Sequence, residues 1–218
     1  MAIRHGYDRT TSDWVLNIDA DELMFLPDQD IGLTLAQLDD DIRTLLVQPV
    51  ERVEHHADNG QSLFRRLMGR DQTEEVYQDL SGAVIRNEGF VGHTLGKSFI
   101  RAGLQDFWMR QHYIQMRNGD KIMDKVIGGD AGAYLLHFFN RGYDDWRRKL
   151  NYRLVHGGYR HRLRELLQGF VDADDEAGLR DVFERLHHLD DRQFDYLKQN
   201  DLLLAVEIDF PAIEARYF

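Results

Sequence analysis

The stretch Trp14-Val15-Leu16-Asn17-Ile18-Asp19-Ala20-Asp21-Glu22 joins a short apolar run directly to a cluster of carboxylates. The run 14–18 is rich in strand-forming residues and predicts a buried β-strand. Side chains alternate along a strand, so Asp19 and Asp21 are expected on the same side, with Ala20 pointing away. Neighbouring carboxylates suit a hard cation such as Mg²⁺ or Mn²⁺, and open α/β sheets bind ligands beyond the carboxyl ends of their strands. The alternative is a surface turn in which the carboxylates bond to nearby backbone amides.

The rest of the chain predicts strands and loops first and helices last. Leucine and isoleucine at helical spacing predict a helix over 34–47, with Thr34 as its N-cap and Pro49 after its end. Short strands are expected at 83–85 and 97–100, and 133–139 is a further apolar run. From Tyr143 onward the pattern is helical; its stripes are Trp146, Leu150 and Leu154, then 163–170, then 179–186, then Phe194, Leu197 and 202–206. We therefore expect an α/β protein with a core at 1–140 and a helical region at 141–218 packed on it.

Composition excludes several classes of protein. The chain has 218 residues and a formal net charge of −11, from 27 lysine and arginine residues against 38 acidic ones, which argues against general nucleic-acid binding. It has no cysteine, so it has neither a disulfide nor a thiolate metal site, and any metal must be held by oxygen and imidazole ligands. No stretch approaches about 18 consecutive apolar residues, and residues 1–9 lack the apolar centre of a signal peptide. A cytoplasmic protein is expected.

Three motifs resemble those of a known enzyme family. The segment 14–23 contains D-x-D-E, the segment 92–101 reads Gly-His-Thr-Leu-Gly-Lys-Ser-Phe-Ile-Arg, and the segment 135–138 reads Leu-Leu-His-Phe, followed by Trp146 and Lys149. In this order they resemble a bacterial subgroup of the family 2-like glycosyltransferases, which have a GT-A fold. The resemblance implies a partial GT-A-like, Rossmann-like mixed sheet and metal-dependent transfer of a sugar from a nucleotide-sugar donor to an acceptor.

The resemblance also implies roles for individual residues. Asp19 and Asp21 would bind Mn²⁺ or Mg²⁺ at the donor diphosphate, and His137 would complete the metal shell. Substrate contacts would come from His93, Lys97 and Arg101 in the second motif and from His112 beyond it. The alternatives are that His137 is a hydrogen-bonded core histidine and that Lys97 is an exposed charge. Gly96-Lys97-Ser98 is not part of a P-loop, because Val91 stands where that motif needs glycine.

Inverting transfer also requires a carboxylate base to deprotonate the acceptor hydroxyl, and the candidates are Glu22 and Asp106. Only thirteen residues precede Trp14, so we expect the nucleotide-binding half of a GT-A domain to be absent. The alternative function is therefore a non-catalytic binding or interaction module derived from a truncated glycosyltransferase. A metal-dependent hydrolase is a third possibility, but it needs more His or Asp ligands at usable spacing than the chain offers.

A basic stretch stands out in this acidic chain. Between residues 141 and 164 eight lysine and arginine side chains occur: Arg141, Arg147, Arg148, Lys149, Arg153, Arg160, Arg162 and Arg164. Such a stretch is usually the solvated face of helices. Two functional alternatives are contact with the donor diphosphate and peripheral docking on anionic lipid.

Overall fold

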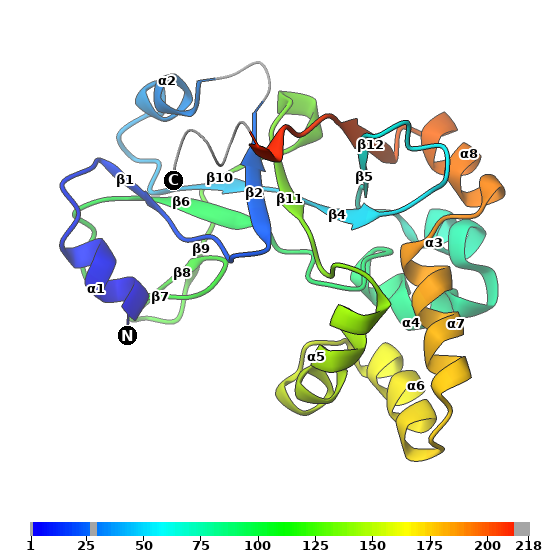
Figure 1. The fold of residues 1–218 in the computed structure, drawn as a ribbon. Helices are drawn as coiled ribbons and strands as arrows, with labels where there is room; N and C mark the ends of the chain where they lie inside the picture. The colour runs from blue at the N-terminus through cyan, green and yellow to red at the C-terminus, as the bar shows by residue number, and fades with distance from the viewer. Residues whose placement is uncertain (1, 27–29, 212–218) are drawn as a thin grey trace. The chain divides into compact units, whose positions relative to one another are not determined.

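The computed structural model describes residues 2–26 and 30–211, shown in Figure 1, and the chain divides into two compact units. Unit 1 comprises Met1–Pro49 and Thr94–His137, and unit 2 comprises Val50–His93 and Phe138–Phe218. The structure is a mixture of helices and strands, as the sequence predicts. The bounds of these units differ from the expected 1–140 core and 141–218 region, because residues from 50–93 share an apolar cluster with the C-terminal helices.

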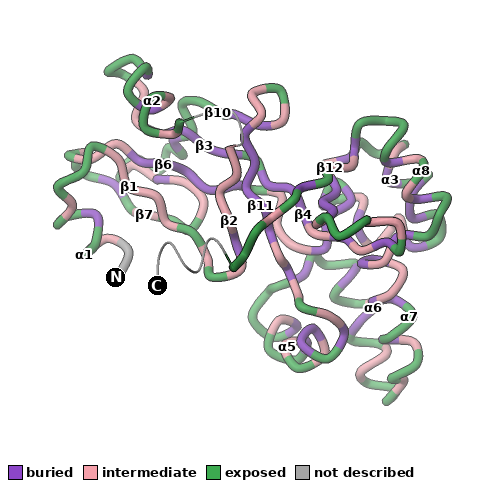
Figure 2. The backbone as a smooth tube through the Cα atoms, turned by 45° about the horizontal axis from the view of Figure 1, so that its top comes forward, coloured by how far each residue is buried: buried purple, intermediate pink, exposed green. Residues whose placement is uncertain are grey.

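Unit 1 is built around a four-stranded sheet. Its order is β1-β6-β3-β10, with β6 antiparallel to both neighbours and β10 parallel to β3. The strand bounds are β1 Trp14–Leu16, β3 Thr44–Val47, β6 Lys97–Arg101 and β10 Lys125–Ile127. In Figure 2 the tube is mostly purple along β3 and β6, which are the two central strands of this sheet. The strands expected at 14–18 and 97–100 are therefore confirmed as β1 and β6.

Two smaller groups of strands complete unit 1. β2 (Glu22–Phe25) pairs antiparallel with β11 (Tyr134–His137), and β7 (Phe107–Met109), β8 (Ile114–Met116) and β9 (Lys121–Ile122) form an antiparallel meander. The helices are α1 (Ala2–Asp8), α2 (Ile31–Ala36) and the 3-10 turn η3 (Gly129–Ala131). One apolar cluster, which includes Leu45, Phe99 and Leu135, packs in this unit, and a second, centred on Ile114, lies under the meander.

The helix predicted over 34–47 is largely wrong. Asp30, and not Thr34, caps α2, which ends at Ala36, and residues 44–47 form the buried strand β3. A short, continuous apolar run such as Leu45-Leu46-Val47 fits a buried strand and a buried helix equally well by periodicity. Pairing with β6 and β10 decides the outcome, and the paired residues of those strands lie fifty or more positions further along the chain.

Unit 2 combines three antiparallel strands with helices. β4 (Pro49–Val53), β5 (Ser62–Arg65) and β12 (Leu203–Val206) pair in the order β4-β5-β12. The longer helices are α3 Arg70–Tyr77, α5 Tyr143–His156, α6 His161–Asp172, α7 Glu176–His187 and α8 Asp191–Gln199. The chain between α3 and residue 88 continues as short helical turns, which are η1 Gln78–Leu80, α4 Ser81–Val84 and η2 Ile85–Asn87.

The helical stripes predicted between Tyr143 and Leu197 are confirmed as α5 to α8. Two short segments of unit 2 differ from their predicted structure. The expected strand at 83–85 is helical, because Val84 is completely buried among the helices of the core. The run 202–206 belongs to a strand and not to the last helix, because Leu203 to Val206 pair with β5. Both errors concern short apolar segments, whose structure is decided by tertiary packing and not by their own composition.

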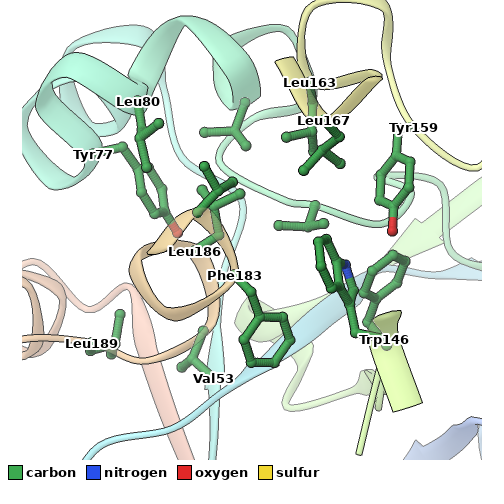
Figure 3. Packing of buried hydrophobic residues seen from close by; sticks show 14 of the residues in the cluster. Val53, Tyr77, Leu80, Trp146, Tyr159, Leu163, Leu167, Phe183, Leu186 and Leu189 are labelled. Atoms are coloured by element: carbon green, nitrogen blue, oxygen red, sulfur yellow. The ribbon is translucent and has the colours of Figure 1, made fainter. Parts of the chain in front are cut away.

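The core of unit 2 is formed by side chains from the helices and from β4. Figure 3 shows Trp146 and Phe183 close together, with Leu163, Leu167 and Leu186 pointing into the same cluster. The Trp146 and Phe183 ring centroids lie 5.3 Å apart, and both residues are almost completely buried. Among the described residues, no helix is both long enough and apolar enough to cross a membrane.

A buried ion pair ties the strands of unit 2 to its helices. Glu51 and Arg65 are register partners on β4 and β5, and neither side chain is exposed. The Arg65 guanidinium also donates to the hydroxyl of Tyr77 on α3 and to the Leu186 carbonyl on α7, at 2.6 Å from the latter oxygen. Glu51 accepts a hydrogen bond from the Val91 backbone N–H at 2.8 Å. These bonds satisfy both charges, which is the condition for burying them.

Leu150 provides a test of the unit 2 core. It is 0% exposed, and Leu150→Ala removes buried methyl groups and leaves a cavity, which should reduce the free energy of unfolding by about 2–5 kcal/mol. Val155→Ala is the matched control, because Val155 is on the same helix and 77% exposed. Urea titration followed by circular dichroism measures both variants. Equal destabilisation by the two would contradict the packing described for α5.

His187 predicts a pH dependence of stability. Burial and the positive charge of Arg65 lower its pKa from 6.5 to about 3. The unfolded state therefore binds more protons than the folded state between these values. The contribution of His187 to the free energy of unfolding is complete above pH 6.5. It is lost as the pH falls from 6.5 toward 3, by up to about 1.4 kcal/mol per pH unit.

The variant His187→Gln removes this titration. From about pH 6 to about pH 5, the free energy of unfolding of this variant should fall less steeply than that of the wild type. The difference in slope should correspond to at most about one bound proton, which is about 1.4 kcal/mol per pH unit. Urea titrations at a series of pH values measure the slope. The control is His161→Gln, because His161 is exposed on α6. An unchanged slope in His187→Gln would mean that another group causes the acid sensitivity.

Candidate functional site

The acidic segment forms a tight turn and does not continue strand β1. β1 ends at Leu16, and β2 begins at Glu22 after a turn in which the Glu22 N–H donates to the Asp19 carbonyl at 3.1 Å. The Glu22 carboxylate in return accepts the Asp19 backbone N–H at 2.8 Å. The strand alternation expected for Asp19 and Asp21 therefore does not apply, because the chain reverses between them. The bond from the Asp19 amide to a carboxylate is the kind that the surface-turn alternative predicts.

Lys97 supplies the positive charge that faces this turn. Its side chain is 0% exposed, and Nζ lies 2.7 Å from Asp19 Oδ2 and 3.4 Å from Glu22 Oε2. The Glu22 side chain is also 0% exposed, so a buried carboxylate and a buried ammonium face each other. A buried charge is stable only beside an opposite charge or several hydrogen bonds. Lys97 was expected to face a phosphate or sugar, or else solvent, but in this structure it binds the acidic turn.

Gly96 lets the chain approach β3 closely just before Lys97. A Cβ atom at this position would lie 1.7 Å from the Val47 carbonyl oxygen, so no residue with a side chain fits without moving the backbone. At Gly96 the loop that was expected to contact substrate is therefore held close to the neighbouring strand. Lys97 then begins β6, as the register partner of Val47.

The tip of the β7–β8 hairpin contacts the same turn. The Gln111 side-chain amide donates to Asp19 Oδ2 at 2.8 Å. The next residue, His112, bonds through Nδ1 to the Gly96 carbonyl at 3.0 Å, and its own carbonyl accepts the Ser98 hydroxyl at 2.8 Å. His112, expected to contact substrate, therefore binds the backbone beside Lys97. No local pattern in the sequence pointed to Gln111.

His137 lies beside the acidic segment, although it is far away in the sequence. β2 and β11 pair in a register that sets His137 opposite Glu22. Both residues are buried, and their potential ligand atoms lie within 4.8 Å of each other. The structure thus brings the imidazole to Glu22, the carboxylate that directly follows the D-x-D.

The other predicted site residues are more dispersed. Asp21 is partly buried in the turn, and His93 is the last residue of the first segment of unit 2. Arg101 donates to the Ile42 and Asp39 carbonyls, each at 2.8 Å, and its guanidinium lies 4.6 Å from the centre of the Trp14 ring. Because these contacts hold α2 and its following turn against the sheet, Arg101 has a structural role here.

Asp106 precedes the β7–β8 hairpin in a left-handed conformation, with a φ of 57°. Its carboxylate lies 3.3 Å from Arg117, and both side chains are largely exposed. The ion pair explains the position of Asp106 in the turn without a catalytic role.

The basic stretch 141–164 is extensively paired within unit 2. Arg148 and Lys149 both bind Asp145, the latter at 2.8 Å, and Arg147 lies 2.9 Å from Glu176. Arg153 donates to the Phe139 carbonyl at 3.0 Å, and Arg160 to the Asn87 side chain at 3.3 Å. These contacts favour a structural role for this part of the stretch.

Two of the donor atoms that a divalent cation could use meet on β2 and β11. Glu22 offers a carboxylate oxygen and His137 an imidazole nitrogen, which are ligands that Mn²⁺ accepts, whereas the Asp21 carboxylate in the adjoining turn does not lie within 4.8 Å of both. Asp19 Oδ2 is already bonded to Lys97 and Gln111, so Asp19 is a poorer candidate ligand than the sequence suggests. The arrangement therefore combines a group that could bind a cation with a lysine that already balances part of its charge.

Comparison with known proteins adds no further information: no family model, no curated protein and no solved structure matches this chain.

Lys97→Met tests the electrostatic role of Lys97. Removing the ammonium leaves Glu22 buried without its opposite charge, so the free energy of unfolding should fall by about 3–5 kcal/mol. Adding Glu22→Gln to this variant removes the carboxylate charge and should restore part of the loss. The control is Lys125→Met, because Lys125 is exposed on β10 in the same unit. Urea titration of the four proteins measures the effect, and a Lys97→Met protein as stable as Lys125→Met would disprove the role.

Proposed function

We propose that this chain is a glycosyltransferase of the GT-A type, with unit 1 as its Rossmann-like catalytic part, and that it transfers a sugar from a nucleotide-sugar donor to an acceptor. The observation that supports this most is the register of β2 and β11, which sets His137 opposite Glu22, next to the D-x-D turn. The sequence resemblance implies that a histidine far downstream of the D-x-D completes the metal shell. The carboxylate beside it in the structure is Glu22, so the proposed cation ligands are Glu22, Asp21 and His137.

A bound Mn²⁺ or Mg²⁺ would supply positive charge to stabilise the departing diphosphate. The chain's own residues prepare this position. Lys97 and Gln111 hold the Asp19 carboxylate through bonds of 2.7 Å and 2.8 Å, which fixes the turn that carries Asp21. Acceptor deprotonation is assigned to neither predicted base: Glu22 is buried against Lys97, and Asp106 is paired with Arg117.

A second candidate function is a non-catalytic binding module. The observation that favours it is the Lys97 ammonium, which already balances the Asp19 and Glu22 carboxylates and so reduces their need for a metal. Nucleotide binding separates the two candidates, because the transferase needs the cation and the diphosphate together.

Asp21→Ala tests the transferase. With Mn²⁺ and a panel of nucleotide-sugars, turnover by the wild type should be lost or reduced at least about tenfold in the variant, because a ligand to the cation is removed. Asp13→Ala is the control, since Asp13 is an exposed carboxylate just before β1. Equal turnover by Asp21→Ala and Asp13→Ala would exclude the metal role of Asp21.

Calorimetric titration tests the second candidate directly. The transferase predicts that UDP or another nucleoside diphosphate gives heat only when Mn²⁺ is present, and that Asp21→Ala weakens this heat. The binding module predicts no nucleotide-dependent heat with or without Mn²⁺. Such a result, together with an absence of turnover, would favour the module over the enzyme.

A further inference from the structure

Two histidines and an aspartate converge on the surface of unit 2, in a cluster that the proposed function does not use. His55 and His56 follow β4, and Asp191 is the first residue of α8. His55 Nε2 lies 3.1 Å and His56 Nε2 3.5 Å from the same oxygen, Asp191 Oδ1. The three residues each offer a ligand atom, and these atoms all lie within 4.8 Å of one another.

The protein fixes His55 firmly in this position. Its side chain is only 2% exposed, and its ring stacks on Phe194 of α8 with centroids 4.1 Å apart and planes 8° from parallel. The backbone of Glu54, just before it, exchanges hydrogen bonds of 2.8 Å with His187 and Leu189, in the segment that leads into α8. The end of β4 and the start of α8 are therefore tied together independently of the three side chains.

Asp191 is available as a ligand, since the cap of α8 is made by its neighbour. The Asp190 carboxylate accepts the Gln193 backbone N–H at 2.7 Å and the Gln193 side chain bonds back to Asp190, which completes the capping box. The Asp191 carboxylate is 79% exposed and the His56 ring 75% exposed, so an ion could reach the cluster from solvent.

We propose that His55, His56 and Asp191 form a binding site for Zn²⁺. Zinc prefers imidazole and carboxylate ligands in tetrahedral geometry, with bonds of about 2.0–2.1 Å, which puts ligand atoms about 3.3 Å apart. The distances of 3.1 Å and 3.5 Å to Asp191 Oδ1 bracket this value. Mg²⁺ and Ca²⁺ favour all-oxygen sites, so two imidazoles select against them.

Three protein ligands leave the fourth tetrahedral position open to water. The site is in unit 2 and shares no residue with the Glu22–His137 group in unit 1, so it is independent of the proposed function. Because a bound ion would join the loop after β4 to α8, it would stabilise the folded form of unit 2.

Binding requires one local rearrangement. The Ala57 backbone N–H donates to His55 Nδ1 at 3.2 Å, so in the metal-free protein the ring proton is on Nε2 and points to Asp191. Zinc at Nε2 moves this proton to Nδ1 and displaces the Ala57 N–H. Ala57 is in the loop after β4 and is partly exposed, so we expect the loss of this bond to weaken zinc binding without preventing it.

Calorimetric titration of the full, tag-free chain with Zn²⁺ near neutral pH tests the site. His56→Ala and Asp191→Asn should each weaken zinc binding by at least about tenfold, because each removes or neutralises a ligand. Neither substitution touches the core, since both side chains are mainly exposed. The matched control is His161→Ala, which removes an exposed histidine of the same unit from outside the cluster and should leave the affinity unchanged.

Thermal unfolding provides a second readout. Zn²⁺ should raise the melting temperature of the wild type and of His161→Ala, and should raise it less in His56→Ala. Zinc binding that is absent in the wild type, or equal in the wild type and His56→Ala, would overturn the proposal. Both substitutions leave Glu22 and His137 intact, so this outcome is separate from the Mn²⁺ and turnover tests of the proposed function.

Discussion

The structure of unit 1 depends on the contact between the buried Lys97 ammonium and two carboxylates. The ammonium is completely buried at the start of β6, and it faces Asp19 and Glu22, which flank the turn between β1 and β2. Burying an ammonium costs several kcal/mol unless opposite charges surround it. The position of Lys97 therefore constrains the turn, and through Gln111 and the Gly96 carbonyl it also constrains the β7–β8 hairpin.

Unit 2 follows the same physical rule in its own core. Glu51 and Arg65 are fully buried as register partners, and hydrogen bonds to Tyr77, Leu186 and Val91 satisfy their remaining groups. In both units a buried ion pair links strands to distant segments of chain. Such pairs add little net stability compared with apolar side chains, but removing one partner is costly. They therefore penalise alternative arrangements of the surrounding loops.

The Lys97 interaction also affects the interpretation of function. An acidic turn with no positive charge near it would need a cation, whereas this turn already has one. The transferase proposal therefore depends on Glu22, Asp21 and His137 more than on Asp19. The His55–His56–Asp191 cluster differs in this respect, because its two imidazoles and one exposed carboxylate have no lysine or arginine partner among the described residues.

The sequence by itself determined the helices α5 to α8, the strands β1 and β6, and the position of the acidic segment after an apolar strand, because these follow from local periodicity and composition. It also predicted that His137 joins the acidic segment, but only through a family resemblance. Tertiary structure alone decided that Leu45 to Val47 form a strand, that Lys97 faces inward, and that Glu22 is the residue opposite His137. The physical reason is that strand register and the partner of a buried charge are set by residues far apart in the chain, which no local pattern specifies.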